Sequence, residues 1–239
     1  MALRPFAESK IYVDWGKSYL IDWIIEMFED YVRILLLKIP PILLALTVHE
    51  CAHGLAATRL GDPTPKFLGR VSLNPFRHLD FIGTIALFLT GMFGWAKPVP
   101  INPRYFKNPS RDMMLTAAAG PASNLFLAAL FSLIYKMMFF LDYGPASMSS
   151  FLFGPLFFMI KFGIVVNVSL AVFNMIPIPP LDGSRVMAHF LSAEKAMGYS
   201  RLEPYGFIIL IALMSTGIIN TLISPIVFYA VRLFVSGGI

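Results

Sequence analysis

The sequence predicts an all-α polytopic membrane protein: a bundle of transmembrane helices with a re-entrant segment and a short β-hairpin-like loop. Composition is the first reason, because 57% of the 239 residues are hydrophobic and 14% are charged, against about a quarter charged in soluble domains. The second reason is the mean hydropathy of +0.70. The third is a series of apolar runs near spanning length, separated by short polar loops.

We expect three parts along the chain. Residues 1–40 form an N-terminal interfacial amphipathic segment, residues 41–203 the core, and residues 204–239 the C-terminal membrane segment or segments. The first ten residues lack the apolar stretch of a cleaved signal peptide, and a single cysteine excludes an internal disulfide. No basic stripe with interleaved aromatics occurs. The expected surroundings are therefore a lipid bilayer and not nucleic acid.

Residues 18–38 carry acidic side chains at helical spacing between apolar ones, with Trp23 and Tyr31 suited to a membrane interface. This pattern favours an amphipathic surface helix over a membrane span. Pro40-Pro41 is expected to break the helix, and a second helix is expected over residues 42–60. Gly61-Asp62-Pro63 ends that second helix.

The second helix carries His49-Glu50-x-x-His53. Histidines four residues apart lie one turn apart on the same face, so both rings can reach one metal ion. Glu50 follows the first histidine and can act as general base toward a metal-bound water. Ionisable side chains are costly in lipid, which indicates a functional role. Arg59 lies ten residues on, so the motif should sit about 15 Å inside that end of the helix.

The loop at residues 65–75 has a short alternation of apolar and polar residues between flanking prolines. This pattern is typical of an edge strand or hairpin near the active site, which would accept an extended peptide by strand addition. The alternative is a structured loop packed under the helices. One short strand pattern does not decide between them.

Residues 81–96 are apolar but short for a membrane span, and the loops on both sides of them are basic. Two basic flanks conflict with a true crossing under the positive-inside rule. We therefore predict a re-entrant segment with both ends on the cytoplasmic side.

Two longer apolar segments follow, at residues 113–141 and 151–176. The loop between them, residues 142–150, has no lysine or arginine and is expected to be external. Residues 205–235 are too long for one ordinary span. Gly217 and Pro225 predict either a kink or a hairpin of two partial segments there.

A catalytic zinc ion has three protein ligands and one open position. Asp182 is the favoured third ligand, because it follows the proline-stiffened turn Pro177-Ile-Pro-Pro-Leu. His78 and His189 are alternatives, although histidines in such basic loops are more often solvated. Cys51 lies on a different face of the helix from His49 and is expected to serve packing.

Three motifs in order resemble the site-2 protease family of intramembrane zinc metalloproteases. They are His49-Glu50-x-x-His53, Gly120-Pro-x-x-Asn124, and Asn174-x-x-Pro177-x-Pro179-x-Leu181-Asp182-Gly183. Residues 69–75 and 94–103 are similar to those of its compact bacterial branch, without PDZ or CBS domains. The resemblance covers roughly residues 42–201.

The resemblance implies a Zn²⁺ ion bound by His49, His53 and Asp182, with Glu50 as the base. It also implies supporting polar roles for Asn124 and Asn174. The alternative is that each asparagine only forms hydrogen bonds between helices, as membrane-buried asparagines often do. The expected activity is hydrolysis of a peptide bond within or near a transmembrane segment of a membrane-protein substrate. The expected location is the cell membrane, as a multi-pass protein of a bacterial inner or plasma membrane. The alternative is a zinc-binding membrane protein or metal transporter without hydrolysis.

Overall fold

The computed structural model describes residues 19–90, 94–141 and 153–235. Within these ranges the regular structure is helical, so the predicted all-α class is confirmed. Four stretches are long and apolar enough to cross a membrane: Asp22–Arg59, Pro109–Phe140, Phe153–Asn174 and Ile218–Val235. The external loop predicted at residues 142–150 lies outside the described ranges.

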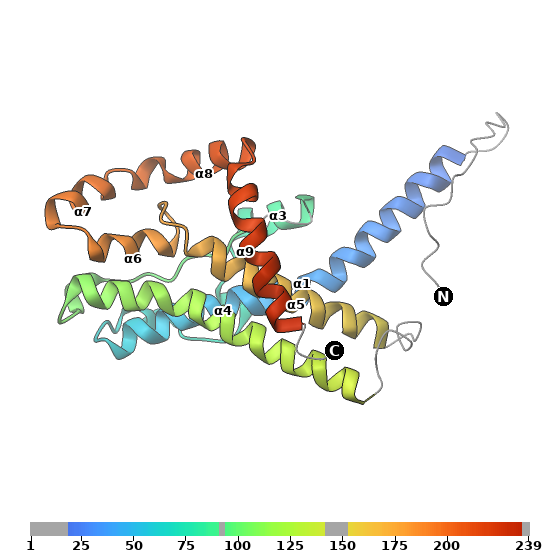
Figure 1. Cartoon of the computed structure of the whole chain (residues 1–239), viewed down its shortest axis with the longest axis horizontal. Coiled ribbons are helices and arrows are strands. Elements are labelled where there is room, and N and C mark those ends of the chain that lie inside the picture. Colours follow the sequence, from blue (N-terminus) through green and yellow to red (C-terminus); the bar gives the residue numbers. More distant parts are fainter. Residues whose placement is uncertain (1–18, 91–93, 142–152, 236–239) are drawn as a thin grey trace.

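Helix α1 (Tyr19–Arg59) is 41 residues long and continues through Pro40 and Pro41. The predicted break at these prolines is wrong. Prolines are tolerated in membrane helices because neighbouring groups and local adjustments satisfy the freed carbonyls. A helix of this length spans about 60 Å, twice the hydrocarbon thickness of a bilayer. Its N-terminal half projects from the body of the protein (Figure 1). The side chains of residues 22–31 are exposed there.

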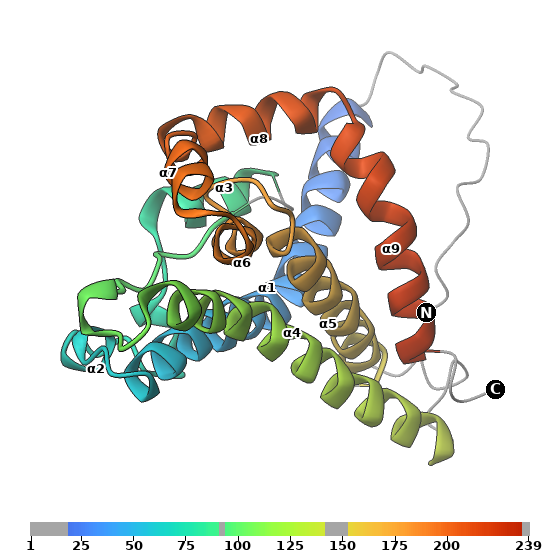
Figure 2. The ribbon, with the colours of Figure 1, turned by 60° about the vertical axis from the view of Figure 1, so that its left-hand side comes forward.

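The core forms where the C-terminal half of α1 packs against α4 (Pro109–Phe140) and α5 (Phe153–Asn174). Small residues in the packed faces, such as Ala45 and Ala128, let these backbones approach closely. Ile164 and Val168 of α5 are fully buried and fill the space between the helices. Figure 2 shows α4 and α5 crossing the bundle side by side, with α1 behind them.

The segment after α1 contains a short helix, α2 (Thr64–Phe67), and a single 3-10 turn, η1 (Pro75–Arg77). The strand or hairpin expected at residues 65–75 is therefore wrong, and the packed-loop alternative describes this segment. Pro65 lies in the first turn of the short helix, where proline is tolerated. The backbone N–H of Arg70 then bonds to the carbonyl of Pro65, which closes the turn.

Helix α3 (Phe81–Thr90) has ten residues. The two ends of this apolar segment meet, because Leu79 and Ala96 form an isolated antiparallel bridge. The segments pack tightly there, since a Cβ added to Gly83 would lie 2.9 Å from the backbone nitrogen of Trp95. Among the described residues this bridge is the sole β pairing. After it the chain runs through the turn η2 (Pro103–Tyr105) into α4.

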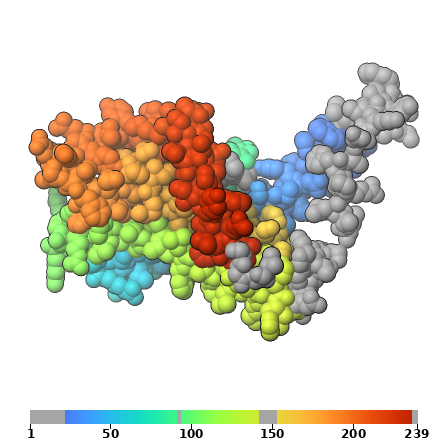
Figure 3. Space-filling view, viewed as in Figure 1, coloured from blue at the N-terminus to red at the C-terminus, as the bar shows by residue number. Residues whose placement is uncertain are grey.

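The C-terminal part lies over α4 as a second layer. It consists of α6 (Asp182–Phe190), α7 (Ala193–Ser200), the turn η4 (Glu203–Tyr205), α8 (Gly206–Ser215) and α9 (Ile218–Val235). The chain bends between α8 and α9 at Gly217, whose φ of 73° favours glycine. The predicted interruption at Gly217 is confirmed, whereas Pro225 lies inside α9 without ending it. Figure 3 shows α9 crossing over the front of the bundle.

Candidate metal centre

Three potential ligand atoms converge between α1 and the first residue of α6. His49 and His53 are 5% and 6% exposed, and their Nε2 atoms lie 3.1 Å apart. Oδ2 of Asp182 lies 3.2 Å from Nε2 of His49 and 3.3 Å from Nε2 of His53. Among the described residues, this is the one cluster of histidine, cysteine and acidic side chains with the spacing for a metal ion.

The other ring nitrogens are held by α4. Nδ1 of His49 lies 2.6 Å from Oδ1 of Asn124, and Nδ1 of His53 lies 2.7 Å from the carbonyl oxygen of Thr116. Both oxygens are acceptors, so each Nδ1 carries the proton and donates it. In the neutral rings both Nε2 atoms then present a lone pair.

The resulting donor set fits a zinc ion. Two unprotonated ring nitrogens and a carboxylate oxygen face one another, and the buried Oδ2 of Asp182 receives no hydrogen bond of normal geometry. Such a group of acceptors repels itself unless a cation or protons lie between them. Four ligands arranged tetrahedrally about 2.0 Å from zinc would be about 3.3 Å from each other. The observed separations of 3.1–3.3 Å match this geometry.

The carboxylate of Asp182 is suited to bind a cation. Burial raises the pKa of this carboxyl, but the neighbouring imidazoles of His49 and His53 outweigh burial and lower the pKa to about 2. Asp182 is therefore ionised at neutral pH. Two hydrogen bonds hold the turn that precedes Asp182. The N–H of Leu181 donates to the carbonyl of Ile178, and the hydroxyl of Tyr199 donates to the carbonyl of Pro177.

Glu50 lies beside this cluster in the wall of a cavity of about 150 Å³. One of its carboxylate oxygens, Oε2, accepts a hydrogen bond of 2.9 Å from the backbone N–H of Val99. The segment that carries Val99 is anchored on both sides. The buried guanidinium of Arg70 donates to the carbonyls of Lys97 and Pro98, and Oδ2 of Asp62 accepts from the N–H of Asn102 at 2.7 Å.

Gly120 explains why a glycine opens the second motif. A Cβ on this residue would lie 2.7 Å from Cε1 of His49 and 2.5 Å from Cε1 of His53. No side chain fits there, because atoms at those distances overlap. The α4 backbone thus presses against both imidazole rings and brings Asn124, one turn further on, level with His49.

Of the other candidate residues, one lines the cavity and three lie outside the metal-spaced cluster. Asn174 lines the cavity, and its amide donates to the carbonyl of Leu170 one turn back. His78 is not solvated as expected but buried, with its Nε2 2.8 Å from the carbonyl oxygen of Ser72. His189 bonds to Ser110 on the surface side of α4, at 2.9 Å. Cys51 is a half-buried free thiol. None of the last three belongs to the metal-spaced cluster of the described residues.

Comparison with known proteins assigns the chain to a family. Two relatives are described as putative zinc metalloproteases. YwhC of Bacillus subtilis is 39% identical over 176 residues, which cover 73% of this chain and 78% of that protein. The chain is a member of peptidase family M50. The model of this family matches residues 144–217, which include the segment around Asp182. Rip2 of Mycolicibacterium smegmatis is 28% identical over 204 residues, or 84% of this chain and 74% of the relative.

Membership in this family confirms the resemblance to the site-2 proteases. The protein is therefore a zinc metalloprotease of the M50 family, with four helices able to cross a membrane. No solved structure matches the chain.

Sequence reasoning missed several groups that hold the site. Thr116 and Val99 act through backbone atoms, which leave no signal in residue type. Arg70 looked like one basic loop residue among several, yet it is buried. Asn167 lies inside an apolar run, and the presence of an asparagine there is the sequence feature that could have indicated its role.

Proposed function

We propose that this M50 protease hydrolyses a peptide bond within or near a transmembrane segment of a membrane-protein substrate. The observation that carries the proposal is the triangle formed by His49, His53 and Asp182 with Glu50 in the same cavity. The two histidines and Glu50 lie on a candidate membrane helix, and Asp182 begins α6, just after the turn that follows another. A substrate reaching them would be cleaved at membrane depth.

In this mechanism His49, His53 and Asp182 hold the metal, and Glu50 is the base. A bound zinc ion would supply the Lewis acidity that lowers the pKa of a water and polarises the scissile carbonyl. Glu50 takes the proton of that water and later delivers it to the leaving nitrogen. The N–H of Val99 fixes one oxygen of the Glu50 carboxylate, which limits its rotation. Asn124 and Thr116 orient the two imidazoles.

The substrate must unwind locally, because a helix hides its peptide bonds in its own hydrogen bonds. A cavity of about 150 Å³ supports this view, since it admits a short extended segment and not a whole helix. The cavity wall includes Pro98, Val99 and Ile101 from a segment without helix or paired strand, and Asn174 from the end of α5. Asn174 is proposed to hydrogen-bond the unwound substrate there.

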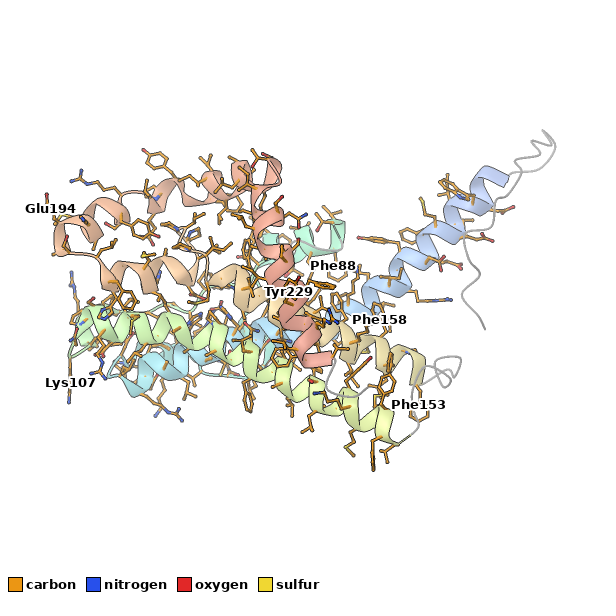
Figure 4. All side chains as sticks on the ribbon, viewed as in Figure 1. Phe88, Lys107, Phe153, Phe158, Glu194 and Tyr229 are labelled. Carbon is orange, nitrogen blue, oxygen red and sulfur yellow. The ribbon has the colours of Figure 1, made fainter. Side chains whose placement is uncertain are left out.

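We further propose that residues 81–96 form a re-entrant segment. The ten residues of α3 extend about 15 Å, half of the hydrocarbon thickness. The bridge between Leu79 and Ala96, with the N–H of Lys97 bonded to the carbonyl of His78 at 2.8 Å, supports both ends lying at one level. Lys107 and Glu194 lie at the end of the molecule where α4 begins, far from Phe153 (Figure 4). That polar end is proposed to be cytoplasmic.

The three-part division of the chain stays a prediction, with an interfacial segment at 1–40, a protease core at 41–203 and a C-terminal membrane part at 204–239. The acidic half of α1 that projects from the body supports an interfacial position for the first part. Its boundary with the core falls inside one continuous helix, so the two parts are not separately folded.

The test is Glu50→Gln in purified protein assayed against a panel of single-span reporter proteins. We expect zinc to stay bound, because Glu50 is no ligand in this scheme, while cleavage disappears. Cleavage that survives the change contradicts the assigned role. A metal transporter is the competing function, and zinc flux into proteoliposomes that persists in Glu50→Ala would favour it over hydrolysis.

A further inference from the structure

Behind His49 lies a chain of buried amides that connects three helices. Asn124 of α4 and Asn167 of α5 are both fully buried. Nδ2 of Asn124 donates to Oδ1 of Asn167 at 2.8 Å and to the carbonyl of Ala45 on α1 at 3.2 Å. Nδ2 of Asn167 in turn donates to the carbonyl of Gly163 at 2.8 Å.

These bonds fix which way each amide points. Gly163 offers a carbonyl, which accepts only, so the NH₂ group of Asn167 faces it and its oxygen faces Asn124. Both protons of the Asn124 NH₂ group are then used, one on Asn167 and one on Ala45. The oxygen of Asn124 is therefore the atom that faces Nδ1 of His49.

The direction of the Asn124 amide determines the tautomer of His49. An amide oxygen at Nδ1 requires the ring proton there and leaves Nε2 with a lone pair. A reversed amide would place NH₂ against Nδ1 and move the ring proton to Nε2, where the ligand atom must be bare. Asn167 supplies one of the two acceptors that oppose this reversal.

We propose that Asn167 is a positioning residue for the metal, acting only through Asn124 on the tautomer of His49. This inference rests on the proposed function of His49 as a zinc ligand. Outer partners of metal-bound histidines typically change metal affinity by about 10- to 100-fold. Because Asn167 stands one residue further out, removing it should weaken zinc binding by about tenfold, at the low end of that range.

The alternative is that Asn167 only joins α4 to α5, as buried amides often do in membranes. The two roles differ in how they combine with loss of Asn124. A residue that acts through Asn124 has no further effect on zinc affinity once Asn124 is gone, whereas general destabilisation adds to it. A double-mutant cycle therefore separates them.

The experiment measures zinc affinity by chelator competition in the full-length, detergent-purified protein, with Asn167→Ala, Asn124→Ala and the double variant. A second variant, Asn167→Ser, keeps a hydroxyl that can bond to the carbonyl of Gly163 but is too short to orient Asn124. Ile164→Ala is the matched control, because Ile164 is fully buried on the same helix and belongs to the hydrophobic cluster with Ile160 and Val168. The d–d spectrum of the cobalt-substituted protein reports the ligand geometry independently of cleavage.

We expect Asn167→Ala and Asn167→Ser to lower zinc affinity about tenfold, to alter the cobalt spectrum, and to add nothing to Asn124→Ala. Ile164→Ala should lower the unfolding temperature without changing either readout. Equal losses of affinity in Asn167→Ala and Ile164→Ala, or full additivity with Asn124→Ala, would overturn the inference. A wild-type protein that binds no zinc would instead overturn the proposed function.

Discussion

The backbone N–H of Val99 donates a hydrogen bond of 2.9 Å to Oε2 of Glu50, across 49 positions of the sequence. The bond joins α1, which carries the candidate metal ligands His49 and His53, to the segment that follows the short helix α3. A general base works well only if its carboxylate is held in one orientation toward the water. The loop at Val99 is thus part of the catalytic arrangement proposed for Glu50.

We predict that Val99→Pro reduces cleavage while zinc remains bound. Proline removes the N–H, and the neighbouring Pro98 and Pro100 already favour an extended backbone that accepts another proline. A hydrogen bond to a charged group contributes about 1.5–3 kcal/mol, so kcat should fall by about tenfold or more. Single-turnover cleavage of a reporter, with zinc content measured on the same samples, checks this.

The control for that variant is Val99→Ala, which keeps the N–H and shortens the side chain. It should retain most of the rate. If Val99→Ala loses as much activity as Val99→Pro, the side chain of Val99 matters and the bond to Glu50 does not.

Gly120→Ala is predicted to abolish tight zinc binding. The added methyl group would lie 2.7 Å from Cε1 of His49 and closer still to His53, so the rings must move out of the ligand geometry. We expect zinc affinity to fall by more than tenfold, as for the loss of an outer partner of the metal. Metal analysis after dialysis against a weak chelator is the measurement.

Gly198→Ala provides the comparison, because a Cβ at Gly198 meets nothing within 4 Å. Alanine in place of this glycine of α7 should stabilise the helix slightly, by up to about 1 kcal/mol. Zinc content should be unchanged. Retention of zinc in Gly120→Ala would show that the α4 backbone has room to retreat, against the packing described here.

The sequence predicted the metal-spaced cluster because its members lie in motifs with a fixed geometry. His49 and His53 share a helix face whatever surrounds them. Asp182 was favoured because it follows a proline-stiffened turn, and the structure brings it beside both rings. The long helices α4 and α5 could also be predicted from the sequence, because an apolar run of that length forms a helix in lipid.

The predictions that were wrong, and the role of Val99 that was missed, concern features that depend on the tertiary surroundings of the residues. The break at Pro40-Pro41 followed from the behaviour of proline in water-exposed helices, and a membrane helix tolerates the same residues. The strand expected at residues 65–75 rested on a period of two over a few residues, and the short helix α2 with the turn η1 takes its place. The role of Val99 lies in a backbone N–H, which every residue except proline carries.

Asp182→Asn is predicted to lose zinc. An amide oxygen binds zinc more weakly than a carboxylate, and the negative charge that offsets the ion is gone. The loss of affinity should exceed the roughly 10- to 100-fold typical for outer partners of a metal site. Glu203→Gln is the matched control, since Glu203 is an exposed carboxylate near the same helix. Its Oε1 lies 4.0 Å from Nη2 of Arg185, and Arg185 lies one turn after Asp182 on α6. Equal zinc in Asp182→Asn and wild type would remove the third-ligand assignment.

The re-entrant segment predicts that the loops before and after α3 are accessible from the same side of the membrane. Phe67 and Tyr105 are 83% and 54% exposed and lie on these two loops, so cysteines there should be open to reagents. In a Cys51→Ala background, Phe67→Cys and Tyr105→Cys should both resist a membrane-impermeant maleimide applied from outside to intact cells. Both should react in inverted vesicles, because the basic flanks place these loops in the cytoplasm.

Reaction of Tyr105→Cys from outside, with Phe67→Cys protected, would mean that residues 81–96 cross the bilayer. The bridge between Leu79 and Ala96 would then not exist in the membrane.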